Sequence, residues 1–337
     1  MKAGYAIETR GLTKKFNGVT AVNHVSFNVK EGEIFGLLGP NGAGKSTTIR
    51  LLCTLTVPTG GTARIGGYDV VKDDNKVREL IGLVSEKMIM YDRLTAKENL
   101  KFFGKLYNIP NDVLERRIKE LIELVHMEKW QDKEVGTFST GMKQRINVIR
   151  ALLNMPKILF LDEPTLGLDP QSSSEIREFV RKLNRENKIT TILTTHMMVE
   201  ADMLCDRIAI MDQGKIVALD TPLNLKRIVS RGGVFELNIS NLNGKLLSLL
   251  KSLPCVKSVA KESETRIRVH TRGSKAFDKI ADAVRSKDGK ILSINSFEPT
   301  LEDVFLHLTG HEVRAQVSKQ ISSRLHRHWG GAKPRVR

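Results

Sequence analysis

The chain has 337 residues, of which 40% are hydrophobic and 27% are charged, and its net charge is +16. This length allows one large and one small domain, and the composition is ordinary for a globular protein. No run approaches the roughly 20 consecutive apolar residues of a membrane-spanning helix, and residues 1–10 hold no apolar segment of signal-peptide length. The three cysteines lie far apart, which argues against a disulfide framework or a zinc site. We therefore expect a protein of the reducing cytoplasm.

The positive charge is concentrated at the end of the chain. Residues 311–337 contain seven basic residues and one acidic residue. Such an excess suits nucleic acid, an anionic membrane or solubility alone. The segment lacks a sustained apolar period, so we expect it to be disordered in isolation.

Up to about residue 220, short apolar runs alternate with amphipathic stretches. Residues 113–125 place apolar side chains on one helical face, and Asp169-Pro170 is typical of a helix N-cap followed by proline at the first helical position. Residues 207–219 are predicted to form a closing hairpin. Strands alternating with helices predict an α/β domain with a mainly parallel sheet. The predicted buried strands are residues 34–38, 81–84, 158–161 and 190–195.

After Thr221-Pro222 the pattern changes to shorter, half-exposed segments. The order of predicted elements is βαββαβ followed by a short helix, which indicates a small α+β domain of the ferredoxin-like type. Its strands are predicted at residues 234–240, 256–261, 266–270 and 291–296, and its helices at residues 242–253, 276–284 and 301–308. We expect domains at residues 1–228 and 229–310, and a basic tail at residues 311–337.

A glycine-rich segment follows the strand 34–38 and opens a predicted helix. Glycines let the backbone curl around a phosphate with its amides pointing inward. Lys45 is then placed to reach the β- and γ-phosphates of a nucleotide, and Ser46 to offer a hydroxyl to Mg²⁺. With a strand before it and a helix after it, a chance glycine turn is the weaker interpretation. The predicted cofactor-binding segment comprises Gly39, Pro40, Asn41, Gly42, Ala43, Gly44, Lys45, Ser46 and Thr47.

Two acids, Asp162 and Glu163, end the strand 158–161. Parallel strands end at one edge of a sheet, so both acids are expected beside the phosphate loop. There Asp162 can hold Mg²⁺ through water, and Glu163 can polarise the attacking water. Alone, two such acids would more often be a solvated loop. His196 follows another strand and is a candidate for a hydrogen bond to the γ-phosphate, although an isolated histidine is usually structural.

The order of these motifs resembles the ABC ATPase family over about residues 5–222. Residues 138–145 are similar to the family's signature sequence, where Ser139 and Gly141 match the core that binds the γ-phosphate. His196 matches its switch histidine. The resemblance implies a P-loop ABC ATPase domain over residues 1–228, with a helical subdomain at about residues 87–150 and the small ferredoxin-like domain behind it.

Other positions take their roles from the same resemblance. Phe16 lies where the family carries an aromatic residue that stacks on adenine, 23 residues before the phosphate loop, and Val22 matches a small apolar contact beside it. Residues 166–169 are similar to the loop that carries signals between two ATP sites, so Asp169 is assigned to the nucleotide site. The family usually has glutamine after the strand 81–84, as a Mg²⁺ ligand and permease sensor. Glu86 stands there in this chain, either as a substitute ligand or as a solvated loop acid.

In this family the signature of one subunit completes the ATP site of another, so a chain with one set of motifs is expected to act as a pair. Two copies, or this chain and a homologous one, would enclose two ATP molecules with Mg²⁺ and drive a separate membrane permease. Residues 298–306 are similar to the ending of ATPases from the drug- and sodium-exporting branch. The expected place is therefore the cytoplasmic face of the membrane, with the tail near anionic lipid. The cargo is not encoded in this subunit.

Two other functions would fit part of the sequence. A soluble ABC ATPase acting on nucleic acid or ribosomes would suit the basic charge. However, only 94 residues separate Lys45 from Ser139, too few for the long coiled coil of DNA-repair members. Translation factors of the family typically join two ATPase domains, and this chain has one set of ATPase motifs. A P-loop kinase would leave the signature and His196 unexplained. We therefore predict a transport ATPase.

Overall fold

The structure is a computed structural model that describes residues 4–229, 233–271, 276–297 and 299–309. The chain forms two compact units that divide between Thr221 and Pro222. The predicted boundary lay seven residues later. It differs because helix α8 (Pro222–Val229) packs against α11 (Leu301–Thr309) of the second unit. The predictions for residues 311–337 fall outside the described residues. None of the helices in the described part of the chain is both long and apolar enough to span a membrane.

The first unit is built on a six-stranded sheet that is parallel except at one edge. All residues of β3, β7 and β8 are buried, which explains why these segments are apolar or β-branched without alternation. The antiparallel strand β10 closes the edge as the predicted hairpin partner of β9. The strand order is β10 (Lys215–Asp220), β9 (Arg207–Asp212), β3 (Ile34–Leu38), β8 (Thr190–Thr195), β7 (Ile158–Asp162) and β6 (Ile81–Val84).

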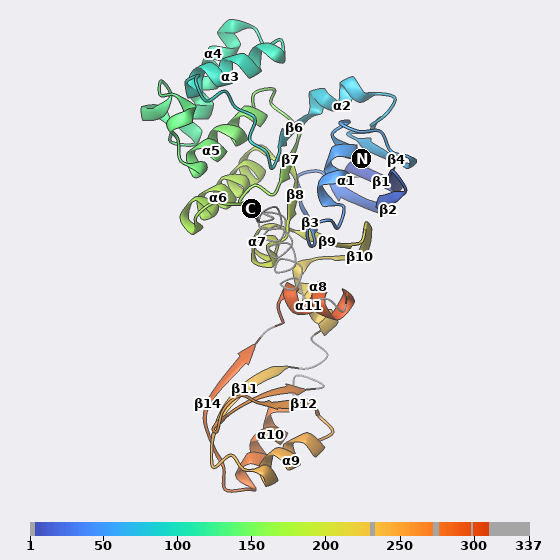
Figure 1. The fold of residues 1–337 in the computed structure, drawn as a ribbon, viewed down its shortest axis with the longest axis vertical. Helices are drawn as coiled ribbons and strands as arrows, with labels where there is room; N and C mark the ends of the chain where they lie inside the picture. Colours follow the sequence, from blue (N-terminus) through green and yellow to red (C-terminus); the bar gives the residue numbers. More distant parts are fainter. Residues whose placement is uncertain (1–3, 230–232, 272–275, 298, 310–337) are drawn as a thin grey trace, which may run out of the picture. The chain divides into compact units, whose positions relative to one another are not determined.

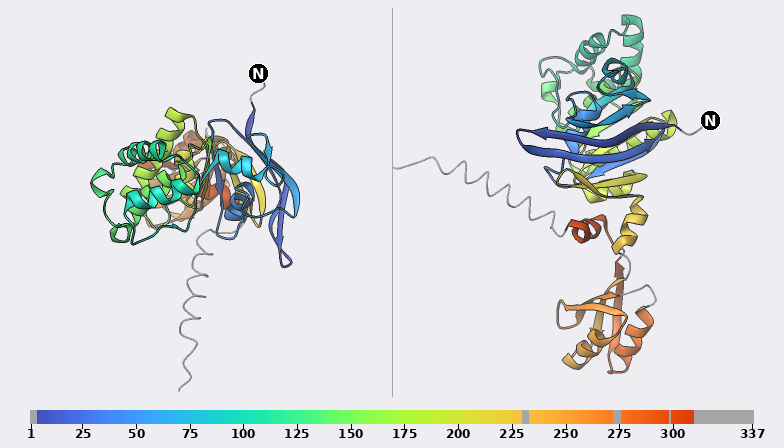
Figure 2. Two further views of the ribbon diagram at one scale, coloured as in Figure 1. Left: turned by 90° about the horizontal axis from the view of Figure 1, so that it is seen from above. Right: turned by 90° about the vertical axis from the view of Figure 1, so that its right-hand side faces the viewer.

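A second sheet of the first unit was not predicted. It is antiparallel, and its long strands β1 and β2 are plain in Figure 2. Irregularities interrupt the register of β1 with β2 at four places, so the period-2 alternation that identifies a strand is broken in the sequence. Both sheets contribute to one hydrophobic core around helix α1 (Lys45–Leu52). The strand order is β2 (Val19–Lys30), β1 (Tyr5–Phe16), β4 (Gly60–Ile65) and β5 (Tyr68–Asp69).

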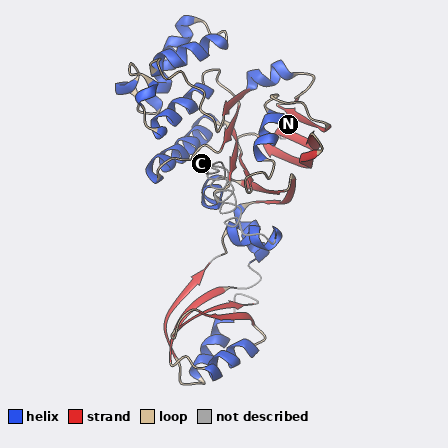
Figure 3. Cartoon of the chain, viewed as in Figure 1, coloured by secondary structure: helices blue, strands red, loops and turns tan. Residues whose placement is uncertain are grey.

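Three α-helices of the first unit lie between β6 and β7, where a helical subdomain was expected. In Figures 1 and 3, α3, α4 and α5 gather at one side of the unit, away from the antiparallel sheet. Thr95 and Glu98 form a capping box that starts α3. The helices are α2 (Asp74–Leu80), α3 (Ala96–Leu106), α4 (Asn111–Leu124), α5 (Thr140–Ala151), α6 (Pro170–Asn187) and α7 (Met198–Leu204), with 3₁₀ turns at Glu128–Trp130 and Val135–Thr137.

The second unit has the predicted βαββαβ order. Its antiparallel sheet has the strand order β12-β13-β11-β14, and α9 and α10 cover one face of it (Figure 1). Alternate residues of β11 and β13 point into that core, among them Leu237, Ile239, Ile267 and Val269. The elements are β11 (Val234–Ser240), α9 (Gly244–Ser252), β12 (Val256–Lys261), β13 (Arg266–Thr271), α10 (Ala276–Arg285) and β14 (Lys290–Phe297).

Candidate nucleotide site

The glycine-rich loop joins β3 to α1, as predicted. Gly42 and Gly44 have φ values of 87° and 100°, which L-residues rarely adopt. A Cβ on Gly39 would lie 2.3 Å from the carbonyl oxygen of Met211, and one on Gly44 would lie 2.4 Å from that of Ala21. These three glycines are therefore required by the local backbone. Helix α1 has no side-chain N-cap, so its first amides are free to bind an anion such as phosphate.

The side chain of Lys45 lies inside this loop. Its Nζ donates hydrogen bonds to the carbonyl oxygens of Gly39, at 2.7 Å, and Pro40, at 3.2 Å. It also forms an ion pair with Glu163, with 3.2 Å between Nζ and Oε1, and both side chains are buried. The lysine therefore connects the phosphate loop to the acid at the end of β7.

Asp162 is held by hydroxyl groups from two other elements. Its Oδ1 accepts hydrogen bonds from Ser46 Oγ, at 3.0 Å, and from Thr194 Oγ1, at 2.6 Å. Strands β3 and β7 both pair with β8, which brings Ser46 and Asp162 to one edge of the sheet as expected. A hydroxyl and a carboxylate are hard oxygen donors of the kind that Mg²⁺ prefers. The described residues contain no cluster of three or more His, Cys, Asp and Glu side chains suited to a metal.

Glu163 adopts a left-handed backbone conformation with φ of 51°. Its amide donates to the carbonyl oxygen of Thr194 and to Thr194 Oγ1, both at 3.1 Å, and these bonds hold the turn. Its Oε2 lies 2.8 Å from Nδ1 of His196. The structure thus unites the two residues proposed for catalysis.

Glu163 and His196 each stabilise the charged form of the other. Burial alone would raise the pKa of Glu163, but the hydrogen bond from His196 and the charge of Lys45 outweigh burial, and the pKa of Glu163 is lowered. The hydrogen bond to Glu163 raises the pKa of His196, against the opposite effect of burial. The arrangement therefore favours an ionised carboxylate between two cationic groups.

The loop after Glu163 is fixed from several sides by residues that sequence reasoning missed. Buried Gln144 donates from Nε2 to the carbonyl oxygen of Pro164 at 2.7 Å, and Thr165 Oγ1 lies 2.8 Å from Oε1 of Glu200. Glu200 carried no signal of its own in the sequence, because α7 begins at Met198, after His196. At the end of the loop, Asp169 accepts the amide hydrogen of Ser172 at 2.9 Å, which confirms it as the N-cap of α6.

The signature segment begins α5. Ser139 is its N-cap and accepts a hydrogen bond from the amide of Met142 at 3.3 Å. Gly141 is buried, and a Cβ there would lie 2.4 Å from Oγ of Ser172 on α6. Within the described residues, no hydrogen bond or ion pair joins Ser139 or Gly141 to the phosphate loop of the same chain.

The remaining predicted site residues lie on other elements. Phe16 ends β1 with its side chain 47% exposed, and Nζ of Lys14 lies 4.9 Å from its ring centroid. Val22 is fully buried in the core. Its contact with adenine stays a prediction. Glu86 is exposed after β6, in a turn where Oγ of neighbouring Ser85 donates to the carbonyl oxygen of Lys87 at 2.8 Å.

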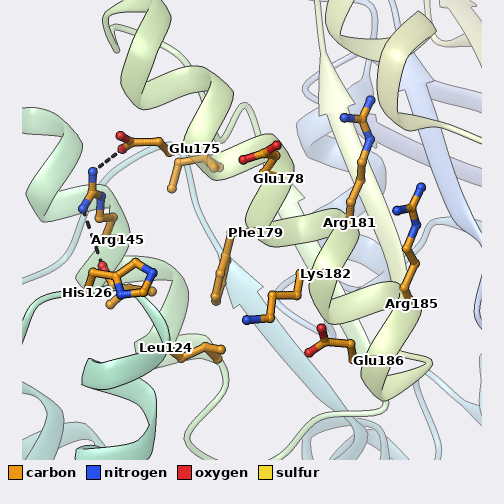
Figure 4. Close-up of a pocket in the computed structure, with 12 residues that line it drawn as sticks. Leu124, His126, Arg145, Glu175, Glu178, Phe179, Arg181, Lys182, Arg185 and Glu186 are labelled. Atoms are coloured by element: carbon orange, nitrogen blue, oxygen red, sulfur yellow. Dashed lines mark hydrogen bonds and ion pairs between the residues drawn. The ribbon is translucent and has the colours of Figure 1, made fainter.

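A cavity of about 560 Å³ lies between the end of α4, α5 and α6, and none of the predicted site residues lines it (Figure 4). Arg145, the last residue of the signature segment, forms an ion pair with Glu175 of α6 at one side of this cavity. Arg145 also reaches the carbonyl oxygen of Val125, at the end of α4. The back of the signature helix is therefore tied to both neighbouring helices.

Comparisons with known proteins identify relatives along most of the chain. The family model described as "ABC transporter" matches residues 22–166. The linearmycin resistance ATP-binding protein LnrL of Bacillus subtilis (strain 168) is 38% identical over 91% of this chain and 99% of its own length. The daunorubicin resistance ATP-binding protein DrrA2 of Streptomyces coeruleorubidus is 36% identical, with coverage of 95% and 99%. The Nod factor export ATP-binding protein I of Neorhizobium galegae is 37% identical, with coverage of 91% and 86%.

Solved structures resemble the first unit. An ATP-binding subunit of an ABC transporter is 30% identical with a TM-score of 0.60, covering 67% of this chain and 93% of that one. The dimeric post-hydrolysis form of the ATP-binding cassette MJ0796, bound to ADP and phosphate, is 28% identical with a TM-score of 0.58, covering 64% and 98%. The alternative of a nucleic-acid ATPase gains no support from these relatives. With the phosphate loop brought beside Asp162, Glu163 and His196, the chain belongs to the ABC transporter family as an ATP-binding subunit that hydrolyses ATP.

Proposed function

We propose that this chain is the cytoplasmic motor of an exporter, working as an ATP-closed pair beneath a separate membrane permease. The observation that carries the proposal is the group formed by Lys45, Glu163 and His196, with both side-chain contacts of Glu163 inside ion-pair distance. Export is favoured because relatives that match nearly the whole chain are named for Nod factor export and for resistance to linearmycin and daunorubicin.

In this proposal Glu163 orients and polarises the water that attacks the γ-phosphate, and His196 holds Glu163 and contacts the γ-phosphate. Lys45 leaves Glu163 when ATP enters the loop, because its ammonium group then pairs with the phosphates. The departure of Lys45 removes one of the two partners of the Glu163 carboxylate. ATP binding itself would thus prepare Glu163 to act on water.

Mg²⁺ would be held by Ser46 and Asp162, whose oxygen atoms already lie side by side. When bound, the ion would neutralise charge on the β- and γ-phosphates. The residues of this chain contribute the rest of the site. Thr194 keeps Asp162 in place through its hydroxyl group, and the amides at the start of α1 bind phosphate oxygens.

A second subunit would complete the site. Ser139 and Gly141 contact no residue of their own phosphate loop through a hydrogen bond in the described structure, which suits a role at the loop of a partner. The partner is a second copy or a homologous ATPase subunit. Solved relatives include dimeric cassettes, and those dimers support this assembly.

The permease would bind at the surface after β6. Exposed Ile89 and Tyr91 lie in the segment that follows Glu86, and exposed Phe102 of α3 contacts Tyr91 edge to face, with 4.9 Å between the ring centroids. Arg150 of the signature helix donates to the carbonyl oxygen of Ile89 at 2.7 Å, which gives this surface a direct link to α5. The basic residues 311–337 would add contact with anionic lipid on the cytoplasmic face.

The test is Glu163→Gln, which preserves the shape of the side chain and removes its charge. We expect ATP binding to persist while turnover falls at least a hundredfold, within the range measured for general bases. With ATP, light scattering should show a mass twice that of the apo protein. Exposed Glu178→Gln on α6 is the matched control, with normal turnover. Normal hydrolysis by Glu163→Gln would refute the assignment.

A further inference from the structure

We infer that Glu200 is a positioning residue for ATP hydrolysis, which ties the loop after Glu163 to the helix that follows His196. The inference rests on the proposed roles of Glu163 and His196. Among the described residues, no hydrogen bond joins Glu200 to the phosphate loop or to Asp162. Its partner is Thr165, whose Oγ1 donates to Glu200 Oε1 at 2.8 Å across 35 residues of sequence.

The contact joins two segments that end in the reacting groups. Thr165 lies two residues after Glu163 in a loop that is also bound by Gln144 of α5. Glu200 lies on α7, whose first turn is closed by hydrogen bonds from the amides of Glu200 and Ala201 to the carbonyl oxygen of Met197, at 3.1 Å and 3.2 Å. Met197 directly follows His196. The Thr165–Glu200 bond therefore fixes the distance between the two segments that carry Glu163 and His196.

The environment of Glu200 is unusual for a carboxyl group. Its side chain is 1% exposed, and burial raises its pKa, against the hydrogen bonds of Thr195 and Thr165. Negative Glu163 raises the pKa further, and Arg177 opposes that effect. A buried acid is expensive unless it is bound by partners. Burying an apolar side chain of similar size here would cost less free energy than burying a carboxyl group. We therefore attribute the presence of glutamate at this position to its hydrogen bond with Thr165.

Loss of the bond has a defined consequence. The left-handed turn at Glu163 would still be held by Thr194, and ATP would still meet an intact phosphate loop. However, α7 would be free to move, and His196 could then leave Glu163. In the structure, 2.8 Å separates Nδ1 of His196 from Oε2 of Glu163. We therefore expect an effect on the rate of hydrolysis and little effect on nucleotide affinity. Catalysis is sensitive to misplacements of about 1 Å.

The experiment is a double-mutant cycle on the full chain, with turnover and affinity for trinitrophenyl-ATP measured for each variant. Glu200→Ala and Thr165→Val should each lower kcat about tenfold, with affinity changed less than about threefold. The double variant should be about as slow as Thr165→Val, which removes the bond to Glu200 and the weak 3.9 Å contact of Thr165 Oγ1 with Met197 Sδ. Thr165→Ser and Glu200→Gln retain a donor and an acceptor respectively, and should recover most of the lost rate.

Three controls make the outcome decisive. Exposed Glu178→Ala should leave both quantities unchanged, and thermal unfolding shows whether each variant is folded at the assay temperature. If Glu200→Ala does not fold, the comparison of Thr165→Val with Thr165→Ser decides alone. Wild-type kcat in a folded Glu200→Ala, or additive losses in the double variant, would overturn the inference. Glu163→Gln is assayed in parallel. If it too hydrolyses ATP normally, the proposed catalytic roles of Glu163 and His196 fail, and not only the positioning role of Glu200.

Discussion

Glu163 contacts both Lys45 and His196 before nucleotide arrives, and these contacts make its contribution to stability depend on pH. The folded-state pKa of His196 is raised, so its contribution to stability is fully present below its unfolded value and is lost as pH rises through the folded value. The pKa of Glu163 is lowered, so its contribution is present above its unfolded value and is lost as pH falls through the folded value. The pair is therefore most stabilising at a pH above the unfolded-state pKa of Glu163 and below the unfolded-state pKa of His196.

We predict that His196→Ala costs more stability at about pH 6 than at about pH 9, because only the charged imidazole pairs with Glu163. The loss near pH 6 should be on the order of 1 kcal/mol for this partly exposed pair. Urea unfolding of the nucleotide-free protein at both pH values provides the measurement. A difference between wild type and variant that does not change with pH would contradict the ion pair.

Glu86 tests whether a carboxylate has replaced the usual glutamine as a metal ligand. Because a carboxylate binds Mg²⁺ more strongly than an amide oxygen, Glu86→Gln should raise the Mg²⁺ concentration that gives half-maximal hydrolysis. The structure leaves Glu86 exposed, so the effect requires the loop to approach the nucleotide. Glu86→Ala should lower hydrolysis and transport together. Superimposable Mg²⁺ titrations of all three proteins would show that Glu86 is only a solvated loop acid.

The site residues that were predictable from sequence lie in contiguous motifs. Lys45, Asp162 and His196 each follow a recognisable strand, and the rule that parallel strands end at one edge placed them together. Thr194 and Glu200 were missed because their roles depend on contacts with residues more than 30 positions away. Nothing in their local sequence distinguishes a hydroxyl or an acid that faces the site from one that faces solvent.

Among the elements, helices α5 and α6 pack closely where Ser172 of α6 meets Gly141 of α5. A Cβ at this position would lie 2.4 Å from Ser172 Oγ and 3.0 Å from its Cβ. The hydroxyl is not free to rotate away without loss, since it donates to Asp169 at 2.6 Å. The signature helix therefore needs glycine for packing, in addition to any role at a partner's ATP.

We predict that Gly141→Ala destabilises the protein by about 1 kcal/mol, because the steric clash exceeds the gain in helix propensity. In a Ser172→Gly background the same change should become stabilising, since the clash is gone and the propensity gain of about 1 kcal/mol remains. Urea unfolding of the four proteins measures both steps. The same cost of Gly141→Ala in both backgrounds would contradict close packing as its cause.

Some strands could be predicted from the sequence and others could not. Strands β3, β7 and β8 were predicted because buried parallel strands are continuous apolar runs. Strands β1 and β2 were missed, although each has 12 residues, because the bulges shift the alternation of buried and exposed positions. Phe16 owes its position to this sheet, so its proposed stacking on adenine depended on an architecture that the sequence did not reveal.

At the scale of the whole molecule, the described residues of the first unit contain every proposed site residue, while the basic excess is concentrated beyond residue 310. Nucleotide chemistry and membrane attraction are therefore assigned to different parts of the chain. Each cation near an anionic surface contributes about 1 kcal/mol at low ionic strength, and salt weakens this attraction. Seven basic residues against one acid give the tail enough charge for measurable binding.

We predict that deletion of residues 311–337 lowers binding to vesicles of mixed anionic and neutral lipid at least tenfold at low salt, while ATP turnover stays within about twofold of the full chain. Binding to purely neutral vesicles should be weak for both proteins. A full-length variant with the seven basic residues changed to glutamine separates charge from Trp329: it should bind as weakly as the deletion if charge provides the attraction. Binding that survives both changes, or that does not fall as salt increases, would show that the tail does not hold this ATPase to the membrane and would leave that task to the permease.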